Sequence, residues 1–449
     1  MSNFKDLYRR KLTTSEASLR GLPRRSSVLL GFFAAQPPSL VQALADGARA
    51  GNFDEVRIYY MHPTPHTATT LLRLELMDVI KPYPFYMGPG ERALTKEATE
   101  AGRKVVYFTP ASFSVVPRII REQITPDVFL LQVAPMDRAG WFSFGLTGAY
   151  SLAGLERTKR LIVEVNASLP RSLGTGMVHI SQVDAIVEHT SEIPLAAGKS
   201  PTHVDERIAA QVLPMIQDGA CVQFGVGGVP DIVAGALKDR KDLGVHTELL
   251  SDGIASLIAC GAVTNRRKTT DPGKSIFNVA MGGSPTYDLI NDNPGIECRA
   301  ADYVNDPRVI GQNENVVSVN AMIECDLMGQ VNAEFLNTHQ FSAAGGQLDF
   351  VRGAYYSRGG LSFIVAPSTA GHGKASRIVP RLQGPATDTR IDTQYVVTEH
   401  GMCQVRGKSS AERALGLIAI ADPAFRDELS AAARVMHLIC GASVGPCPF

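Results

Sequence analysis

Short β-rich runs alternate with helix-patterned segments along almost the whole chain, and this alternation limits the possible folds more than any other feature. Segment 39–51, SLVQALADGARAG, is one of the helix-patterned stretches. The β-rich runs include RSSVLLGF (25–32), EVRIYYM (55–61), RKVVYFT (103–109), DVFLLQVA (127–134), RLIVEVN (160–166), NVVSVNA (315–321), LSFIVAP (361–367) and TQYVVTE (393–399). This alternation is typical of α/β proteins with mostly parallel sheets covered by helices.

The two halves of the chain contain similar units. VLLGFFAAQPPSLVQAL starts at Val28, and CVQFGVGGVPDIVAGAL starts at Cys221. Each reads as an apolar strand, a loop with glycine and proline, and an amphipathic helix, and a second strand follows each. We therefore predict two similar open α/β domains, residues 1–200 and 201–449, joined within the Pro-, Gly- and charge-rich stretch 192–207.

The composition excludes several partners. The 449 residues contain 44 basic and 44 acidic side chains, so the formal net charge is zero, with no basic footprint for nucleic acid or a membrane surface. The apolar run around VLLGFFAA is too short to span a bilayer. Hydrophobic residues make up 45% of the chain, which is enough for a large core, and we expect Trp141 to lie in it.

The cysteine pattern predicts a reducing compartment. The count is odd and no C-x-x-C pair occurs, so we expect neither disulfides nor a structural zinc. The N-terminus has no apolar signal core. Its arginines and serines faintly resemble a mitochondrial presequence, but Asp6 and Glu16 argue against that, and we predict a cytoplasmic protein. The cysteines are Cys221, Cys260, Cys298, Cys325, Cys403, Cys440 and Cys447.

Glu248 is the first candidate for chemistry. It lies in HTELLSDG (246–253), between apolar residues and just before a turn, where a strand of an open α/β sheet ends. Such ends often carry functional residues, although a surface acid on a loop is the simpler interpretation.

Two glycine-rich segments could bind anions. FGVGGVPD (224–231) should expose backbone N–H groups at a helix start. A dinucleotide fingerprint is the alternative here, but Pro230 replaces its third glycine. In the second segment, 342–380, glycines crowd beside Asp349 and Arg352, and Lys374 and Arg377 follow in a Ser/Gly-rich turn that suits a phosphate. The histidines show no metal-ligand spacing.

Several motifs together resemble the acetyl-CoA hydrolase/transferase family, which includes 4-hydroxybutyrate, butyryl-, succinyl- and itaconate-type CoA-transferases. The resemblance runs from about residue 5 to residue 430. The last residues, MHLICGASVGPCPF, have no counterpart in it. The matching motifs are HTELLSDG, FGVGGVP, VEVNASLPRSLG, DLMGQVNAE, GGQLDFVRGAYYSRGG, APSTAGHGKASRIVP and VVTEHGMCQVRGK.

The resemblance implies two similar α/β domains with the active site between them, and it assigns roles to residues. Glu248 would be the nucleophile that forms a covalent glutamyl-CoA thioester without a metal. Backbone N–H groups at Val229 and Gly346 would stabilise the oxyanions. CoA and acyl-CoA would be substrates rather than a permanently bound cofactor, and the enzyme would be a homo-oligomer, a dimer or tetramer. The implied CoA-binding residues are Gly227, Gly228, Gly345, Gln347, Arg352, Gly353, Lys374, Arg377 and Lys408.

Three functions remain open at this point: a CoA-transferase, an acyl-CoA hydrolase on the same scaffold, and a non-catalytic CoA-binding protein. The acceptor acid is also open. Phe32 and Phe33 place bulk in GFFAAQPP, and neither this segment nor YYMHPTPH contains an arginine for a second carboxylate. We expect a C4 or C5 acid, 4-hydroxybutyrate or itaconate, with succinate as a further candidate.

Overall fold

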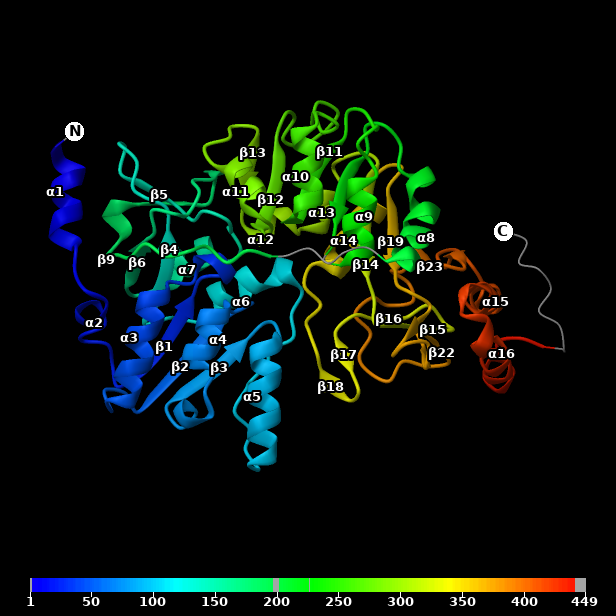
Figure 1. Ribbon diagram of the computed structural model, residues 1–449, viewed down its shortest axis with the longest axis horizontal. Coiled ribbons are helices and arrows are strands. Elements are labelled where there is room, and N and C mark those ends of the chain that lie inside the picture. Colours follow the sequence, from blue (N-terminus) through cyan, green and yellow to red (C-terminus); the bar gives the residue numbers. More distant parts are fainter. Residues whose placement is uncertain (1, 197–201, 226, 441–449) are drawn as a thin grey trace. The chain divides into compact units, whose positions relative to one another are not determined.

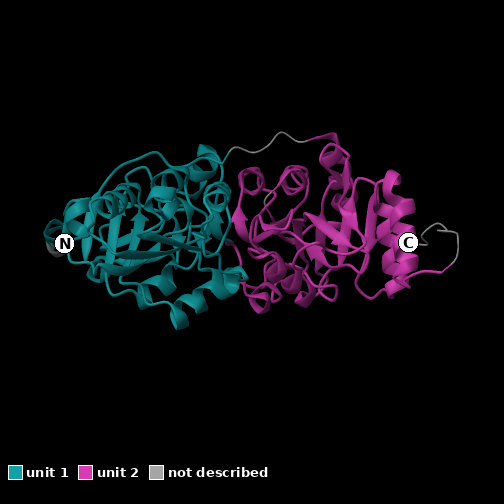
Figure 2. Ribbon diagram, turned by 90° about the horizontal axis from the view of Figure 1, so that it is seen from below, with its two compact units in different colours: residues 1–196, 276–304 teal, residues 197–275, 305–449 magenta. Residues whose placement is uncertain are grey.

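The computed structural model describes residues 2–196, 202–225 and 227–440. Within it the chain forms two compact units, drawn in different colours in Figure 2. Unit 1 comprises Met1–Ala196 and Ile276–Val304, and unit 2 comprises Ala197–Ser275 and Asn305–Phe449. The domain boundary expected between residues 200 and 201 lies outside the described residues. The sequence also did not predict that a later segment returns to unit 1.

Unit 1 is built on a six-stranded sheet with strand order β3-β2-β1-β4-β6-β9 (Figure 1). Every neighbouring pair in this sheet is parallel. Its strands are β1 (Arg25–Leu30), β2 (Glu55–Tyr60), β3 (Ile80–Pro84), β4 (Val128–Val133), β6 (Leu161–Val165) and β9 (Ala185–Glu188). Its main helices are α1 (Ser2–Lys11), α3 (Pro38–Arg49), α4 (Pro65–Leu71), α5 (Pro89–Glu100), α6 (Val116–Gln123) and α7 (Ser151–Arg157).

The core of unit 1 explains why its strands read as nearly continuous apolar runs. All six residues of β4 are buried, as expected for a central parallel strand covered on both faces. Leu40 and Leu44 of α3 lie one turn apart and are fully buried in the cluster that contains Val28 and Val128. Each such leucine contributes about 1.5–3 kcal/mol by leaving water.

The segment that returns to unit 1 carries all but the first residue of β12 (Ser275–Ala280), followed by α11 (Ser284–Ile290), β13 (Ile296–Cys298) and α12 (Ala301–Val304). Strand β13 pairs in parallel with β7 (Leu173–Gly174). A small antiparallel pair joins β5 (Trp141–Ser143) and β8 (Met177–His179).

Two expectations for unit 1 are wrong. Residues 103–109 form no strand, although Tyr107 and Thr109 donate backbone hydrogen bonds to the carbonyls of Pro82 and Pro84 in β3. Proline has no N–H to return these bonds, so a ladder cannot form. Trp141 is 40% exposed and lies edge-on to the ring of His179 rather than in the core.

Unit 2 has a second, mostly parallel sheet, whose strands follow the order β24-β23-β19-β14-β10-β11. All neighbouring pairs among these are parallel except β23 and β24. The strands are β10 (Cys221–Phe224), β11 (Gly244–Leu250), β14 (Val316–Ala321), β19 (Leu361–Val365), β23 (Tyr395–Thr398) and β24 (Gly401–Gln404). The helices are α8 (His203–Val212), α9 (Gly228–Gly235), α10 (Asp252–Ala259), α13 (Pro307–Ile310), α14 (Gln347–Tyr356), α15 (Ser410–Ile420) and α16 (Arg426–Val435).

The internal repeat read from the sequence is confirmed. In unit 1, β1 leads through α3 to its parallel neighbour β2, and in unit 2, β10 leads through α9 to its parallel neighbour β11. The predicted α/β class with mostly parallel sheets is therefore correct for both units.

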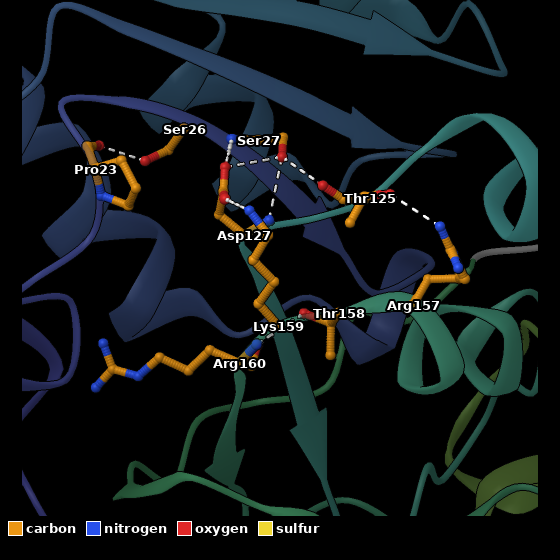
Figure 3. A network of polar contacts seen from close by, with 9 residues as sticks. All are labelled: Pro23, Ser26, Ser27, Thr125, Asp127, Arg157, Thr158, Lys159 and Arg160. Atoms are coloured by element: carbon orange, nitrogen blue, oxygen red, sulfur yellow. Dashed lines mark hydrogen bonds and ion pairs between the residues drawn. The ribbon is translucent and has the colours of Figure 1, made fainter.

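A polar network fixes the amino edge of the unit 1 sheet (Figure 3). Asp127, just before β4, accepts hydrogen bonds from the backbone N–H of Ser27 in β1, at 2.8 Å, and from its hydroxyl, at 3.0 Å. Lys159, just before β6, lies 2.7 Å from the other carboxylate oxygen. Burial raises the pKa of Asp127, but the ion pair with Lys159 and the bonds from Ser27 outweigh it, so the pKa lies below its ordinary value. One carboxylate thus joins the starts of three strands.

No helix in the described ranges is both long and apolar enough to cross a membrane. The six cysteines of the described part are free thiols, and Cys447 lies outside it.

Candidate active site

Glu248 lies at the carboxyl edge of the parallel strands of unit 2. Strands β10 and β11 are in register at Cys221–Gly244 and Val222–Val245. Extending this register brings Phe224, the last residue of β10, level with Thr247, so the glycine-rich turn after β10 begins beside Glu248. Ligands of open α/β sheets bind at this edge.

The carboxylate of Glu248 is held by an amide and a glycine turn. Nδ2 of Asn305 donates to its Oε2 at 2.5 Å. A Cβ added at Gly346 would lie 2.0 Å from both Oε2 of Glu248 and Nδ2 of Asn305, and one at Gly345 would lie 3.6 Å from Oε1. Gly345 has a φ of +54°, a conformation that favours glycine. The backbone at Gly346 can approach the carboxylate this closely only because glycine has no side chain.

These surroundings make the acidity of Glu248 unusual. Burial raises its pKa to about 7; the hydrogen bond from Asn305 opposes the rise, the negative charge of Asp349 adds to it, and the backbone hydrogen bond from Gly346 opposes it. The residue as a whole is partly exposed to solvent. A carboxylate in this range is more basic than an ordinary glutamate and is still substantially ionised at neutral pH.

Helix α14 presents the glycine turn. Gly346 is its N-cap, and Gln347 is its first residue. The side chain of Gln347 donates to Oδ2 of Asp388 at 2.6 Å, so its amide nitrogen already has a partner within unit 2. The sequence motif therefore contributes backbone at Gly345 and Gly346, and an anchor at Gln347.

The turn after β10 has the geometry of a helix start. Gly227 is the N-cap of α9 with a φ of +143°, and Gly228 and Val229 form the first turn, with Val229 buried. A Cβ at Gly228 would lie 3.2 Å from Oδ2 of Asp205. Residue 226 is outside the described residues. These backbone groups lie at the same edge as Glu248, and their oxyanion role stays a prediction.

The basic residues named from the sequence fall into different places. Lys374 is exposed in the turn between β20 (Thr369–Ala370) and β21 (Ala375–Ser376), beyond the carboxyl end of β19. Arg377 donates to the carbonyl of Ile323 at 2.8 Å, and burial lowers its pKa. Arg352 makes a two-bond ion pair with Asp392 at 2.9 and 3.1 Å.

Lys408 lies elsewhere. It follows β24, whose last residue, Gln404, pairs with the first residue of the oppositely directed β23, Tyr395. This places Lys408 at the amino edge of the sheet, opposite the edge that carries Glu248. A CoA phosphate on any of the four cations remains a prediction.

Gly353, the remaining predicted CoA-binding residue, has a packing reason to be glycine. A Cβ there would lie 2.5 Å from Cγ2 of Ile310. Its absence lets α14 approach α13 closely.

The sequence did not reveal Asn305. It lies 57 positions from Glu248, and its segment, VNDPRV, carries no motif for a catalytic amide. Its 0% exposure and its direct bond to Glu248 become visible only in the fold. No group of three or more His, Cys, Asp or Glu side chains within residues 2–196, 202–225 and 227–440 is placed to hold a metal ion.

Fold and site together define an α/β protein of two related units, with a glutamate at a strand end held by an amide and a glycine turn. The acetyl-CoA hydrolase/transferase N-terminal domain matches residues 2–196, and the C-terminal domain of the same family matches residues 282–433. The chain belongs to the acetyl-CoA hydrolase/transferase family.

Similar proteins agree with this assignment. The chain is 38% identical over 431 residues to 4-hydroxybutyrate coenzyme A transferase of Clostridium kluyveri, covering 95% of this chain and 98% of that one. It is 45% identical over 350 residues to succinyl-CoA:cyclohexane-1-carboxylate CoA transferase of Geobacter metallireducens, covering 77% and 79%. The crystal structure of RipA from Yersinia pestis has a TM-score of 0.95 at 47% identity and covers 97% and 100%. The chain is an enzyme that transfers CoA, as the sequence motifs predict.

Proposed function

We propose that this enzyme exchanges CoA between a short-chain acyl-CoA and a short carboxylic acid, with Glu248 as the covalent nucleophile. The observation that carries the proposal is the environment of the Glu248 carboxylate, which combines a raised pKa with two converging N–H donors. A strand end, a glycine turn and an amide donor meet at this carboxylate.

The reaction begins with attack by a carboxylate oxygen of Glu248 on the thioester carbonyl of the acyl-CoA. The C–S bond breaks, CoA leaves as the thiolate, and a mixed anhydride forms. The thiolate then attacks the glutamyl carbonyl of this anhydride, which releases the first acid as a carboxylate. The product is a glutamyl-CoA thioester on Glu248, and the carboxylate of the second acid enters by the same steps in reverse.

Each attack on the glutamyl carbonyl places negative charge on an oxygen of Glu248. The amide of Asn305 already donates to Oε2 of Glu248, and the backbone of Gly346 lies against the same oxygen. They support an oxyanion role, and removing one such donor from an enzyme typically costs about 3 kcal/mol of transition-state stabilisation. Val229 is the corresponding candidate on the turn after β10.

For the acceptor, we propose a C4 or C5 acid. Phe32 and Phe33 follow β1 at the carboxyl edge of the unit 1 sheet and are 6% and 5% exposed. The ring of Phe33 lies edge-on to that of His62, with centroids 5.1 Å apart. The segments GFFAAQPP and YYMHPTPH, which carry these rings, contain no arginine, and this supports 4-hydroxybutyrate over itaconate or succinate, whose second carboxylate needs a cation.

Trapping the intermediate tests this proposal. Acyl-CoA added without an acceptor acid should strand part of the enzyme as the glutamyl-CoA thioester, which borohydride reduces to the alcohol. Peptide mass analysis should then place the change at Glu248, and borohydride alone should leave the enzyme active. An enzyme that transfers CoA without any labelling would exclude the covalent mechanism, and labelling of another acid would exclude Glu248.

Two assays decide the remaining alternatives. Free CoA formed from acyl-CoA in the absence of any acid would identify a hydrolase, whereas formation of the acceptor's own CoA thioester without free CoA identifies a transferase. A panel of acceptor acids with one acyl-CoA donor ranks 4-hydroxybutyrate, itaconate and succinate. The cytoplasmic location and the homo-oligomeric state stay predictions.

A further inference from the structure

The glycine turn beside Glu248 is anchored from behind by a carboxylate that the proposed reaction does not use. Asp388 is 0% exposed and accepts the amide of Gln347 at 2.6 Å. The main chain of Asp388 is itself paired with Val331, by N–H to O=C bonds of 3.1 and 3.0 Å. Gln347 directly follows Gly346 in the chain. By accepting the side-chain hydrogen bond of Gln347, Asp388 fixes the residue next to the glycine turn.

The other end of the turn segment is tethered as well. The backbone N–H groups of Phe341 and Ser342 donate to the carbonyl of Glu334 at 2.8 and 3.0 Å. The carboxylate of Glu334 accepts the amide of Gln340 at 2.7 Å and the hydroxyl of Thr387 at 3.0 Å. Thr387 precedes Asp388 in the chain, so both tethers meet in one short segment.

The turn needs such support because of its composition. A glycine pair has no side chains to pack, and glycine loses more backbone freedom on folding than any other residue. A reacting group displaced by about 1 Å can lose about 100-fold in rate. Residues that fix the groups next to a reacting atom are therefore part of what makes a site work.

We infer that Asp388 is a positioning residue for CoA transfer, which holds the Gly346 N–H against Glu248 through Gln347, while Glu334 tethers the opposite end of the same segment. This inference rests on the proposed function of Glu248. Asp388 itself has no part in bond making or breaking.

The chemistry of Asp388 indicates which substitution should preserve this role. Burial raises its pKa to about 7; the hydrogen bond from Gln347 opposes the rise and the charge of Asp392 adds to it, with smaller effects from Arg352 and Glu334. Oδ1 of Asp388 is buried and accepts no hydrogen bond among the described residues. The carbonyl oxygen of a neutral side chain can accept the hydrogen bond from Gln347. Asparagine at position 388 should therefore preserve the positioning role, whereas alanine, which has no acceptor, should lose it.

The test compares Asp388→Ala with Asp388→Asn by steady-state kinetics. For Asp388→Ala we expect kcat to fall about 10- to 100-fold, with KM for acyl-CoA within about twofold of the original enzyme. Asp388→Asn should keep at least about half of kcat, because it keeps the acceptor. Unchanged kcat in Asp388→Ala, or a loss confined to KM, overturns the inference; the latter would assign Gln347 to CoA binding.

A matched control separates positioning from general loss of stability. Asp326 is also 0% exposed and accepts a glutamine amide, from Gln330 at 2.7 Å, in a turn after β15 (Glu324–Asp326). Asp326→Ala should lower Tm and leave kcat unchanged, and Gln330→Leu serves if that variant does not fold. An equal loss of kcat in the control overturns the inference.

A double-mutant cycle completes the test. If Asp388 acts through Gln347, Gln347→Leu added to Asp388→Ala should lower kcat by less than about twofold more. If the loss of kcat in the double variant equals the product of the losses in the two single variants, Asp388 and Gln347 act independently, which would contradict the inference. Borohydride trapping in the unmodified enzyme reports separately on Glu248. A failure there refutes the proposed function, whereas successful trapping together with an unchanged kcat in Asp388→Ala refutes only the role of Asp388.

Discussion

Nδ2 of Asn305 lies 2.5 Å from Oε2 of Glu248, and the two residues are 57 positions apart in the chain. Asn305 is fully buried, and its other amide atom, Oδ1, accepts no hydrogen bond within the described structure. A buried amide that leaves one atom unpaired while donating to a carboxylate is costly for stability alone. Its position therefore points to a role in the reaction at Glu248.

Asn305→Ala removes one of the two donors to the Glu248 carboxylate. We expect kcat for CoA transfer to fall about 100-fold, as for single oxyanion donors in other enzymes. Asn313→Ala is the matched control, because Asn313 is equally buried but bonds to the backbone of Thr269 and Thr270. A similar loss of kcat in both variants would mean that Asn305 only stabilises the fold.

Glu248→Gln should abolish transfer, because an amide cannot form the thioester. Glu248→Asp should also be severely impaired, since the shorter stem withdraws the attacking oxygen from both donors. Initial rates of CoA exchange and far-UV circular dichroism measure activity and fold together. Substantial exchange by a folded Glu248→Gln variant would refute the nucleophile role.

The pKa of Glu248 predicts how rate and stability depend on pH. Attack needs the ionised carboxylate, so kcat/KM for acyl-CoA should rise with pH through about 7 and then level off.

The same pKa predicts how the stability of the protein depends on pH. The pKa of Glu248 in the folded state lies above the unfolded value near 4.3, so the folded state keeps its proton up to a higher pH than the unfolded state. The free energy of unfolding therefore falls as pH rises from about 4.5 to 7. Denaturation should show Glu248→Gln more stable than the original by roughly 1–2 kcal/mol at pH 8, with the difference gone near pH 4. A constant difference across this range would argue against the raised pKa.

Gly346→Ala should remove activity through contact rather than chemistry. Its Cβ would lie 2.0 Å from Glu248 and Asn305, so the turn or the carboxylate must move. We expect at least about a 100-fold loss of kcat. Gly235→Ala in α9 is the control, because nothing lies within 4 Å of its added Cβ, and it should leave kcat unchanged. Near-normal turnover of Gly346→Ala would mean that the turn has no part in catalysis.

Asp127→Asn should weaken unit 1 without touching the site at Glu248. The substitution removes the negative charge of the carboxylate that pairs with Lys159 and accepts hydrogen bonds from Ser27. We expect the free energy of unfolding to fall by about 1–2 kcal/mol at pH 7. Because the folded pKa is lowered, this stability is present above the unfolded pKa and is lost as pH falls through the folded pKa, so the two proteins should converge in acid. Asp78, 81% exposed in its pair with Arg103, is the control, and Asp78→Asn should change stability by less than about 0.5 kcal/mol. Equal losses would show that the network in Figure 3 is no stronger than a surface ion pair.

The alternation of apolar runs and amphipathic helices was sufficient to predict two related α/β units, because strand and helix periods are local properties of the chain. The same local reading failed at residues 103–109, where the neighbouring strand has prolines at the positions that should donate hydrogen bonds. Pairing depends on both partners, and one segment alone does not reveal the other.

The sequence by itself determined Glu248 and the Gly345–Gly346 turn as candidates, because motifs record residue type and spacing. Only the tertiary structure decided what surrounds them. Asn305 and Asp388 reach the turn from 57 positions after Glu248 and from 41 positions after Gln347, and no local pattern marks either. The raised pKa of Glu248 is likewise a tertiary property, since it arises from burial and from Asp349, about 100 residues away. Desolvation and charge act through space, so they exist only once the chain has folded.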